Sequence, residues 1–597
     1  MKQIYLSNPF KKFFQKSKVS LILLLVGYFN SAQAVAPDAR TVSANRVTYT
    51  SAILNALVNA NSLSTTISFE YGLTTSYGSS ISIPGTLLGA ADSFRKVNLT
   101  NLMAHKVYHF RVVATNASGT TNGEDRTFIT GGVSSSNNGR GGHSLIVDSS
   151  GLVYSFGINN FGQLGDGTTT TRSKPVRVLK GAYPGTAYLG DNPSNPIIAV
   201  ASGTTHSLAL AADGTVWAWG YNGQGQLGDG TLINQYTPVK VLKGLYAGTT
   251  YLGDNSTNPI IAISAGLWLS SALGADGKVY PFGFNANGQL GNNTTAFSAT
   301  PIISLKGAYN GTTYLGDNAS NPIIAMNCGS SHIMALTANG QVFTYGFNAY
   351  GQLGDGSVGA KGLPVKPFKG AYPGTTYLGD DSLNPIIAIS THGYSSFVLS
   401  EQGGLYSFGY NNGGQLGDGT AGNKLSPVRV LKGAYSGTTF LGDNPANPIQ
   451  SFCGGPHHTL VLTSNGALYS FGTNAAGQLG DGTTSTRTTP VRVLKGAYAG
   501  TTFLGDNPSN PIVAIMASDS FAPAALVAHS IIITADGHLH SFGYNSDGQL
   551  GDNSNINRTT PVRVQHVSAS GYLNVLESTK PSARTVVANR ITYTSAN

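Results

Sequence analysis

Charged residues are scarce in this chain. Asp, Glu, Lys and Arg together make up 10% of its 597 residues, whereas soluble globular proteins average about 25%. Glycine is abundant, at 77 residues, and it supplies the tight turns that join β-strands. The composition argues against a helical or coiled-coil protein and favours β-structure.

Cysteine is nearly absent as well. The sequence contains two, Cys328 and Cys453, which fall in different repeats, and it has no CxxC spacing. A disulfide requires Cα atoms closer than about 7 Å, so we expect no intramolecular bridge. The spacing also offers no cysteine-based metal site.

Long hydrophobic runs are absent after residue 34. Residues 1–34 combine five lysines, an apolar run at 19–29 and the sequence Ala32-Gln33-Ala34, which is typical of a secretory signal with its cleavage site. The run is shorter than the roughly 20 residues that span a membrane. We therefore expect a protein that is secreted, extracellular or on the cell surface of a bacterial envelope.

A strong basic charge is lacking once that segment is set aside. The whole chain has a net charge of +9, and removing five lysines leaves 30 basic and 26 acidic residues, a net charge of +4. Nucleic-acid binding normally needs a concentrated basic face. We expect no nucleic-acid partner.

Catalytic motifs are missing too: the sequence has no HExxH, no GxSxG and no phosphate-binding glycine loop. We expect no enzyme, no cofactor and no metal site, with calcium binding left open. Histidines recur at one register but in separate repeats, which predicts a structural hydrogen bond at a strand start and not a shared metal. They are His143, His206, His332, His458 and His529.

What the sequence does have is a repeat. The core GQLG occurs seven times, with five steps of 63 residues and a last step of 71. Such a period indicates a repeat architecture. In the unit at 206–220, HSLALAADGTVWAWG, a strand leads through an Asp-Gly turn into a second strand whose aromatics alternate with small residues. This alternation predicts aromatic packing between sheets. Pro281 interrupts it and should weaken the third unit.

Two resemblances follow from these motifs. The combination HSLAL–DG–VWAWG–N–GQLGDG–T–PVKV resembles the repeats of the regulator of chromosome condensation family, which implies a seven-bladed β-propeller. The runs AILNALVNANSLSTTISFEYGLTTSYG, LTNLMAHKVYHFRVVATNASG and TFIT resemble bacterial fibronectin type III domains. The expected fold is all-β, with an N-terminal fibronectin type III-like β-sandwich before the propeller.

The expected domain bounds follow from the repeats. They are a signal peptide at 1–34, the sandwich at 36–131, a linker at 132–142, the propeller at 143–576, and at 577–597 a linker and the start of a second sandwich, because 583–596 nearly duplicates 39–52. A PVRV strand follows the seventh repeat and none precedes the first. We expect the C-terminal strands to complete the first blade.

The candidate binding residues lie in an insert that follows six of the PVRVLK-type strands. One hypothesis is that the inserts form an exposed collar that binds a polymeric ligand by avidity. The alternative is that each insert is a self-packed hairpin with Lys–Asp surface pairs. Phe521, in a loop that only the seventh repeat has, is a further candidate. The insert tyrosines are Tyr183, Tyr246, Tyr309, Tyr372, Tyr435 and Tyr498.

The sequence analysis leads to one functional hypothesis and two alternatives. We expect a secreted or cell-surface, non-enzymatic binding or adhesion protein, monomeric, with an extracellular protein or polysaccharide as partner and no small GTPase. The alternatives are an extracellular hydrolase with its site on the propeller face, and a purely structural spacer. The identity of the ligand does not follow from the sequence.

Overall fold

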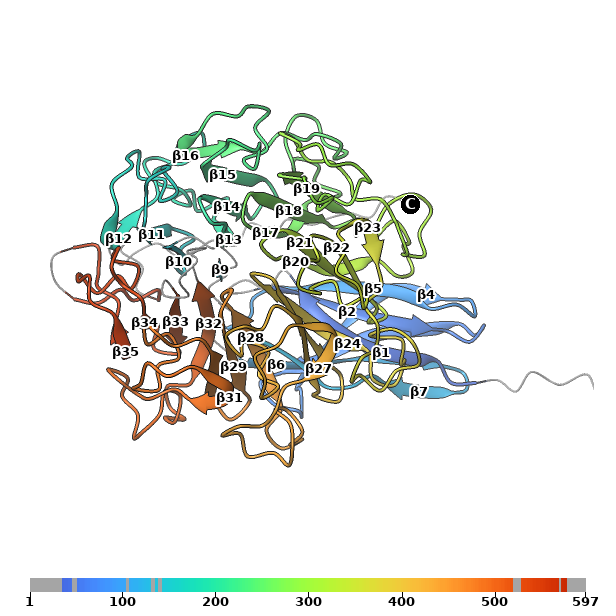
Figure 1. Cartoon of the computed structure of the whole chain (residues 1–597). Coiled ribbons are helices and arrows are strands. Elements are labelled where there is room, and N and C mark those ends of the chain that lie inside the picture. The colour runs from blue at the N-terminus through green and yellow to red at the C-terminus, as the bar shows by residue number, and fades with distance from the viewer. Residues whose placement is uncertain are drawn as a thin grey trace, which may run out of the picture.

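The computed structural model describes residues 35–45, 51–103, 107–129, 135–137, 142–518, 528–568 and 571–576. All regular elements in these ranges are β-strands, arranged as a small N-terminal two-sheet unit beside a ring of seven sheets (Figure 1). The all-β class is confirmed. None of the described segments forms a helix long and apolar enough to cross a membrane.

The N-terminal unit is a β-sandwich of two sheets. Its buried core draws on both sheets, with Leu54 and Val58 from one and Phe69, Phe110 and Val112 from the other. Alternate residues of the strand at 107–116 point into this core, as expected. The fibronectin type III assignment and the bounds 36–131 stay predictions. The first sheet is β1 (Asp38–Asn45), β2 (Ala52–Asn59) and β5 (Ser93–Leu99); the second is β4 (Ser79–Leu87), β3 (Thr65–Gly72), β6 (Val107–Asn116), β7 (Gly119–Asn122) and β8 (Arg126–Ile129).

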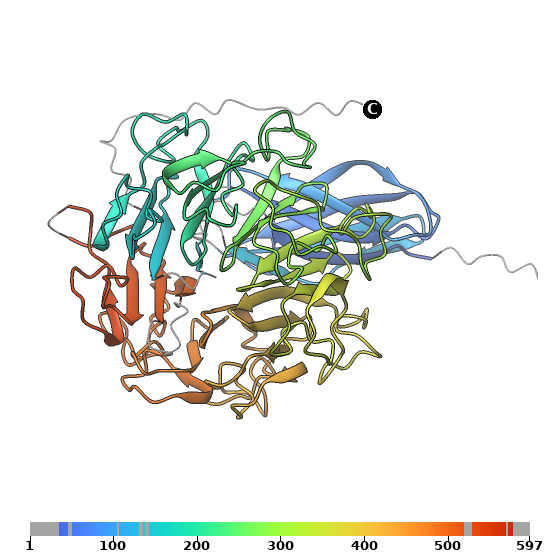
Figure 2. The same cartoon turned by 45° about the horizontal axis from the view of Figure 1, so that its top comes forward.

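The ring has one sheet, or blade, for each repeat, in chain order around the centre (Figure 2). Blade 1 is β10 (His143–Val147), β11 (Val153–Gly157) and β12 (Arg172–Arg177). Blade 2 is β13 (Ile197–Ser202), β14 (His206–Ala211), β15 (Val216–Gly220) and β16 (Gln235–Lys240). Blade 3 is β17 (Ile260–Ala265), β18 (Leu269–Gly274) and β19 (Val279–Gly283). Blade 4 is β20 (Ile323–Cys328), β21 (His332–Thr337), β22 (Val342–Gly346) and β23 (Lys361–Val365).

The remaining three blades follow the same four-strand order. Blade 5 is β24 (Ile386–His392), β25 (Ser395–Ser400), β26 (Leu405–Gly409) and β27 (Lys424–Arg429). Blade 6 is β28 (Ile449–Gly454), β29 (His458–Thr463), β30 (Leu468–Gly472) and β31 (Arg487–Arg492). Blade 7 is β32 (Ile512–Ser518), β33 (His529–Thr534), β34 (Leu539–Gly543) and β35 (Arg558–Arg563).

The expected aromatic alternation packs blade against blade. In blade 2, Trp217 and Trp219 are fully buried and Ala218 lies between them. Trp219 reaches the preceding blade, where its Nε1 donates to the carbonyl of Gln163 at 2.9 Å. The inter-sheet role predicted for the aromatic strand of each repeat, which is the third strand of a blade such as β15, is therefore confirmed.

Blade 3 departs from the pattern where Pro281 stands. Its described sheet has three strands and no outer strand, and Gly283 and Ser298 form only an isolated bridge. Proline lacks the N–H that would donate to the outer strand. The weakening expected in this unit is confirmed.

The expected route of ring closure is wrong. The PVRV strand β35 pairs with β34 of its own blade, so it completes blade 7 and not blade 1. The short strand β9 (Ser135–Asn137) pairs in parallel with β13 of blade 2. Blades 1 and 7 meet through packing and hydrogen bonds, such as Ser149 N to Val575 O at 2.9 Å. Residues 571–576 bridge to blade 7 at His538 and Gln565.

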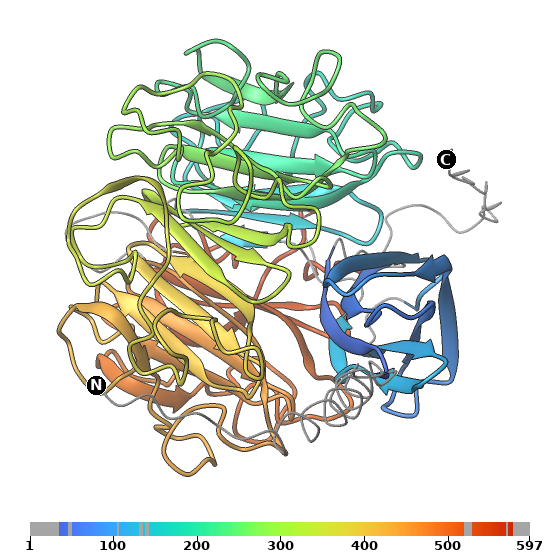
Figure 3. The same ribbon diagram turned by 90° about the vertical axis from the view of Figure 1, so that its right-hand side faces the viewer.

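The ring has two unlike faces. On one, which we call the loop face, lie the connections between first and second strands, such as 203–205, and between third and outer strands, such as 221–234. On the other, the insert face, lie the Asp-Gly-type turns, such as 212–215, and the inserts. The sandwich lies against one side of the ring (Figure 3), where it contacts turns and strand starts of the insert face.

Candidate binding face

The six insert tyrosines are not an exposed collar. Their side chains are 1–3% exposed. Each ring packs edge-on against an aromatic side chain of the next blade, as Tyr183 does on Trp217 with centroids 5.4 Å apart. Each hydroxyl donates to a backbone carbonyl, such as Asn321 O at 2.7 Å from Tyr309. These residues belong to the core between blades, and the geometry gives them no access to a ligand.

The charged groups of the inserts serve the inserts themselves. Asp254 accepts hydrogen bonds from the amides of Thr249, Thr250 and Tyr251 and from the Thr249 hydroxyl. Partial burial acts to raise the pKa of Asp254, but these hydrogen bonds outweigh it and lower the pKa to about 2. Lys243 donates to the carbonyl of Gly248 at 3.1 Å. The inserts therefore match neither hypothesis in full: their tyrosines pack on the next blade, and their Lys and Asp bond groups of the insert and not each other.

A second aromatic side chain recurs five residues after each insert tyrosine. A Lys or Arg from the end of the outer strand lies over five of these rings, those of Tyr188, Tyr251, Tyr377, Phe440 and Phe503. The guanidinium of Arg429 lies 4.3 Å from the ring centre of Phe440, and the ammonium of Lys240 lies 4.8 Å from that of Tyr251. Such contacts contribute about 0.5–1 kcal/mol each at exposed sites. These contacts hold five of the inserts against their own blades.

The histidine register links neighbouring blades. His143 Nε2 lies 3.0 Å from Ser207 Oγ, and Ser207 in turn donates to Gln163 O at 2.7 Å. The histidine is therefore the donor to the serine. Equivalent bonds join His206 to Ser270, His332 to Ser396, His458 to Ser530 and His529 to Ser144. Burial lowers the pKa of each of these five histidines to about 3. Within the described residues, no group of three or more His, Cys, Asp and Glu could hold a metal ion.

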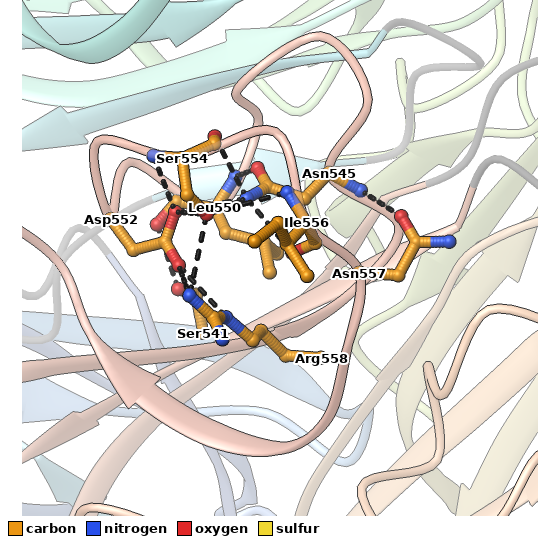
Figure 4. A network of polar contacts seen from close by, with 8 residues as sticks. All are labelled: Ser541, Asn545, Leu550, Asp552, Ser554, Ile556, Asn557 and Arg558. Carbon is orange, nitrogen blue, oxygen red and sulfur yellow. Dashed lines mark hydrogen bonds and ion pairs between the residues drawn. The ribbon is translucent and has the colours of Figure 1, made fainter.

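The loops that contain GQLG lie on the loop face and are cross-linked by hydrogen bonds. In blade 7, the Asn545 side chain donates to Asp552 Oδ1 at 2.9 Å and accepts from the Leu550 amide at 2.9 Å (Figure 4). Asp552 also accepts from Arg558 Nε at 3.0 Å, and Ser541 Oγ donates to Leu550 O at 2.7 Å. Side chains of the loop and of the two strands that flank it therefore hold the loop in place.

Two clusters of half-exposed aromatic side chains lie on the loop face. The first runs across blades 1–3, with ring centroids 5.1–6.5 Å apart; its members are Phe161, Tyr221, Trp268 and Phe284. The second runs across blades 4–6, with centroids 4.9–5.9 Å apart; its members are Phe347, Tyr350, Tyr394, Tyr410 and His457.

Sequence reasoning missed these clusters, although a signal existed. The residue after the third strand is aromatic in five repeats, namely Tyr221, Phe284, Phe347, Tyr410 and Tyr544. Because it lies beyond the alternating strand, it need not be core. The remaining candidate, Phe521, lies outside the described residues, as do 1–34 and 577–597.

Comparison with known proteins places this fold among relatives. The RCC1-like domain profile matches residues 184–580, and the regulator of chromosome condensation repeat profile matches 150–210. The ultraviolet-B receptor UVR8 of Arabidopsis thaliana is 26% identical over 436 residues, which cover 72% of this chain and 81% of the receptor. The probable E3 ubiquitin-protein ligase HERC4 of Homo sapiens is 36% identical over 239 residues, 40% of this chain but only 20% of the ligase.

Solved structures agree on the fold. Human WBSCR16 superposes with a TM-score of 0.53 at 21% identity, covering 70% of this chain and 95% of that one. Prp20p from Saccharomyces cerevisiae superposes with a TM-score of 0.51 at 20% identity, covering 69% and 85%. At these identities the likeness shows the propeller fold alone.

These relatives correct two expectations. A secreted adhesion protein is contradicted, because the relatives are regulators such as the ultraviolet-B receptor and probable ubiquitin ligases. The partner expectation, which excluded small GTPases and nucleic acid and favoured an extracellular protein or polysaccharide, is contradicted too. Prp20p has binding properties toward Gsp1p and histones, and yeast RCC1 (Prp20) has been solved bound to Kap60. The location of this chain is untested and stays a prediction.

Proposed function

The chain belongs to the RCC1-like domain family, whose profile covers residues 184–580, and on this premise we propose that it is a non-catalytic regulator that binds a partner protein through its loop face. The observation that carries the proposal is the pair of half-exposed aromatic clusters. Aromatic side chains dominate the energetics of protein interfaces.

Exposed apolar side chains around these clusters support the same face. They come from the loops between third and outer strands and from the outer-strand starts of blades 2, 3, 4, 5 and 7. They are Leu232, Ile233, Tyr236, Phe297, Val358, Leu425 and Ile556. Exposed apolar side chains on the same face as aromatic anchors are typical of a protein-binding patch.

The charges of this face are largely neutralised within it. Asp166 pairs with Arg172, Asp418 with Lys424 and Asp552 with Arg558, at 2.7–3.0 Å. Since these charges already have partners, the aromatic rings are the groups with unused binding capacity. We therefore propose that apolar contact, more than charge, selects the partner.

The partner class follows from the family. Relatives with this fold include Prp20p, which binds Gsp1p and histones, and the ultraviolet-B receptor. We propose a folded protein as partner, which makes Gsp1p and core histones the first purified probes.

The test compares wild type with two variants of the full chain. The double variant Tyr350→Ala, Tyr394→Ala removes the centre of the second cluster, and Tyr377→Ala removes an exposed aromatic of the insert face as a matched control. Binding to purified probes is measured by surface plasmon resonance, and a photo-crosslinking residue at position 394 or 377 identifies contacting proteins by mass spectrometry. Thermal unfolding verifies that each variant is folded.

The expected result is that the double variant weakens binding by at least about tenfold, since central aromatic anchors contribute about 2 kcal/mol or more, while the control does not. Crosslinks should form from position 394 and not from 377. Binding that survives the double variant, or crosslinks that form only from 377, would refute the loop face as the binding surface.

The N-terminal sandwich takes a supporting role in this proposal. We infer that it is a fibronectin type III-like module, an assignment that the grouping of β1-β2-β5 against β4-β3-β6-β7 supports. It lies on the insert face, so the loop face is left open to a partner.

A further inference from the structure

One turn position differs among the otherwise similar blades. The position six residues after the histidine register, such as Ala212 after His206, begins the turn on the insert face. In six blades it is small and uncharged, and in blade 5 it is glutamate. The series is Ser149, Ala212, Ala275, Ala338, Glu401, Ser464 and Ala535.

The sandwich places one cation on this position in each of three consecutive blades. Lys96 Nζ, from β5, lies 3.5 Å from Ala275 O in blade 3. Arg40, from β1, donates to Ala338 O in blade 4. Arg126, from β8, forms an ion pair with the Glu401 carboxylate in blade 5.

An apolar contact accompanies these three cations. Val42 and Leu57 of the sandwich share a buried cluster with Ile324 of blade 4, and Phe94 packs against the same cluster. The position of Ile324 is isoleucine in the blades beside the sandwich and glutamine in blade 6, the next one around the ring. The series is Ile198, Ile261, Ile324, Ile387 and Gln450.

We propose that the insert face carries a docking surface for a β-sandwich, in which Glu401 determines the blades on which the sandwich docks. Seven similar blades offer seven nearly equivalent turns, so backbone carbonyls alone would not select one position. A single carboxylate breaks that equivalence, because only blade 5 can neutralise Arg126. The partner of this surface is the N-terminal sandwich of the same chain.

The contact is buried enough for the carboxylate to matter. The Arg126 side chain is 7% exposed and that of Glu401 is 20% exposed. Burial raises the pKa of Glu401, while Arg126 and Arg40 act to lower it and Glu124 to raise it. Removing one partner of a buried ion pair leaves the other charge uncompensated, which is strongly unfavourable. Arg126 also donates to Thr41 O within the sandwich, so its head group cannot simply turn to water.

The test uses amide hydrogen exchange on three variants of the full chain. Glu401→Gln keeps the shape of the side chain and removes the charge. Ser464→Glu combined with Glu401→Gln returns a carboxylate to the same face, one blade further on. Glu70→Gln, which breaks the Glu70–Arg111 pair inside the sandwich, is the matched control.

Two segments report docking and one reports folding of the ring. Residues 38–42 and 386–389 lie at the contact, whereas 206–211 lies inside blade 2. With Glu401→Gln, exchange at the contact should rise by at least about tenfold, as expected for an uncompensated buried charge, while 206–211 stays protected. The double variant should behave in the same way, because blade 6 has Gln450 at the position where Ile324 makes the apolar contact, and the control should match wild type at the contact.

Two results would overturn the proposal. One is wild-type protection of 38–42 and 386–389 in Glu401→Gln, which would make the carboxylate irrelevant to docking. The other is restored protection in the double variant, which would show that any carboxylate on the face suffices. Both outcomes are independent of partner binding at the loop face.

Discussion

At the scale of single residues, the insert tyrosines show how a neighbour distant in sequence decides burial. Tyr183 packs on Trp217, which stands in the next repeat, and its ring is almost fully buried. A pattern within one repeat cannot reveal this contact. The insert sequence predicts aromatics and turns correctly, whereas the exposure of those aromatics depends on how one blade lies on the next.

The buried histidines predict acid sensitivity. Each of the five has a folded-state pKa of about 3, below the unfolded value of about 6.5. The unfolded chain therefore binds protons first as the pH falls. The stability that the neutral histidines contribute is present above about pH 6.5 and is lost toward pH 3, by about 1.4 kcal/mol per pH unit for each histidine.

The measurement is urea unfolding between pH 7 and pH 4, with His206→Leu as a comparison. Leucine occupies this register naturally at Leu269, so it is compatible with the fold. The variant should lose less stability than wild type over the acid range, even if it is less stable at pH 7. Equal slopes in both proteins would contradict the prediction. The insert aspartates, whose pKa values are lowered to about 2, are the same in both proteins, so their contribution cancels in the comparison.

At the scale of elements, the loops that contain GQLG predict that one Asp→Asn substitution lowers the free energy of unfolding by different amounts in different blades. Asp552 pairs with Arg558 at 2.8 Å, whereas the equivalent Asp229 has the neutral Gln235 in place of the cation, at 3.3 Å. Asp552→Asn should therefore cost about 1–3 kcal/mol of unfolding free energy, as for a hydrogen bond to a charged group. Asp229→Asn should cost less, and Asn292 already stands at this position in blade 3.

Chemical denaturation of the two single variants measures whether Asp552→Asn loses more unfolding free energy than Asp229→Asn. The hydrogen bond that Asn545 donates to Asp552, and the equivalent one that Asn222 donates to Asp229, can persist with an amide acceptor, so the difference between the variants isolates the cation. An equal loss in the two variants would mean that the ion pair adds nothing to the loop.

The elements themselves were largely predictable, because period-two alternation and Asp-Gly turns are local signals. The alternation of large and small side chains at Trp217, Ala218 and Trp219 predicts a strand that is buried on both faces, without knowledge of any tertiary contact. The absence of an outer strand in blade 3 was foreseeable in the same way from Pro281. The aromatic clusters of the loop face were not, since they join residues such as Tyr350 and Tyr410 that are one repeat apart.

At the scale of the whole molecule, the expectation that was wrong concerns how the two ends of the propeller ring meet. A surplus PVRV strand after the last repeat suggested a strand shared between the ends of the ring. It belongs instead to blade 7, because each outer strand follows its own GQLG loop. Blade 1 has three described strands, and its junction with blade 7 depends on side-chain packing and a few hydrogen bonds. The number of repeats predicts the number of blades, but it does not show at which strand of a blade each repeat begins.

This junction predicts where the ring is weakest. Val575 is fully buried in a cluster that joins Ile146 and Tyr154 of blade 1 to Ile531 and Leu539 of blade 7. Val575→Ala should destabilise the chain by about 1–3 kcal/mol through the lost burial and the cavity, and the effect should be local. Hydrogen exchange should increase in β10 and β33, on either side of the junction, before it increases in blade 4.

A matched substitution separates local from global weakening. Val342→Ala removes an equally buried valine from the middle of blade 4. It should raise exchange in blade 4 and leave the junction protected. If Val575→Ala instead raised exchange uniformly around the ring, the seven blades would open as one cooperative unit, and packing at the junction would be no weaker than between any other pair of blades. A change confined to β10 and β33 would identify the junction as the point where the ring opens.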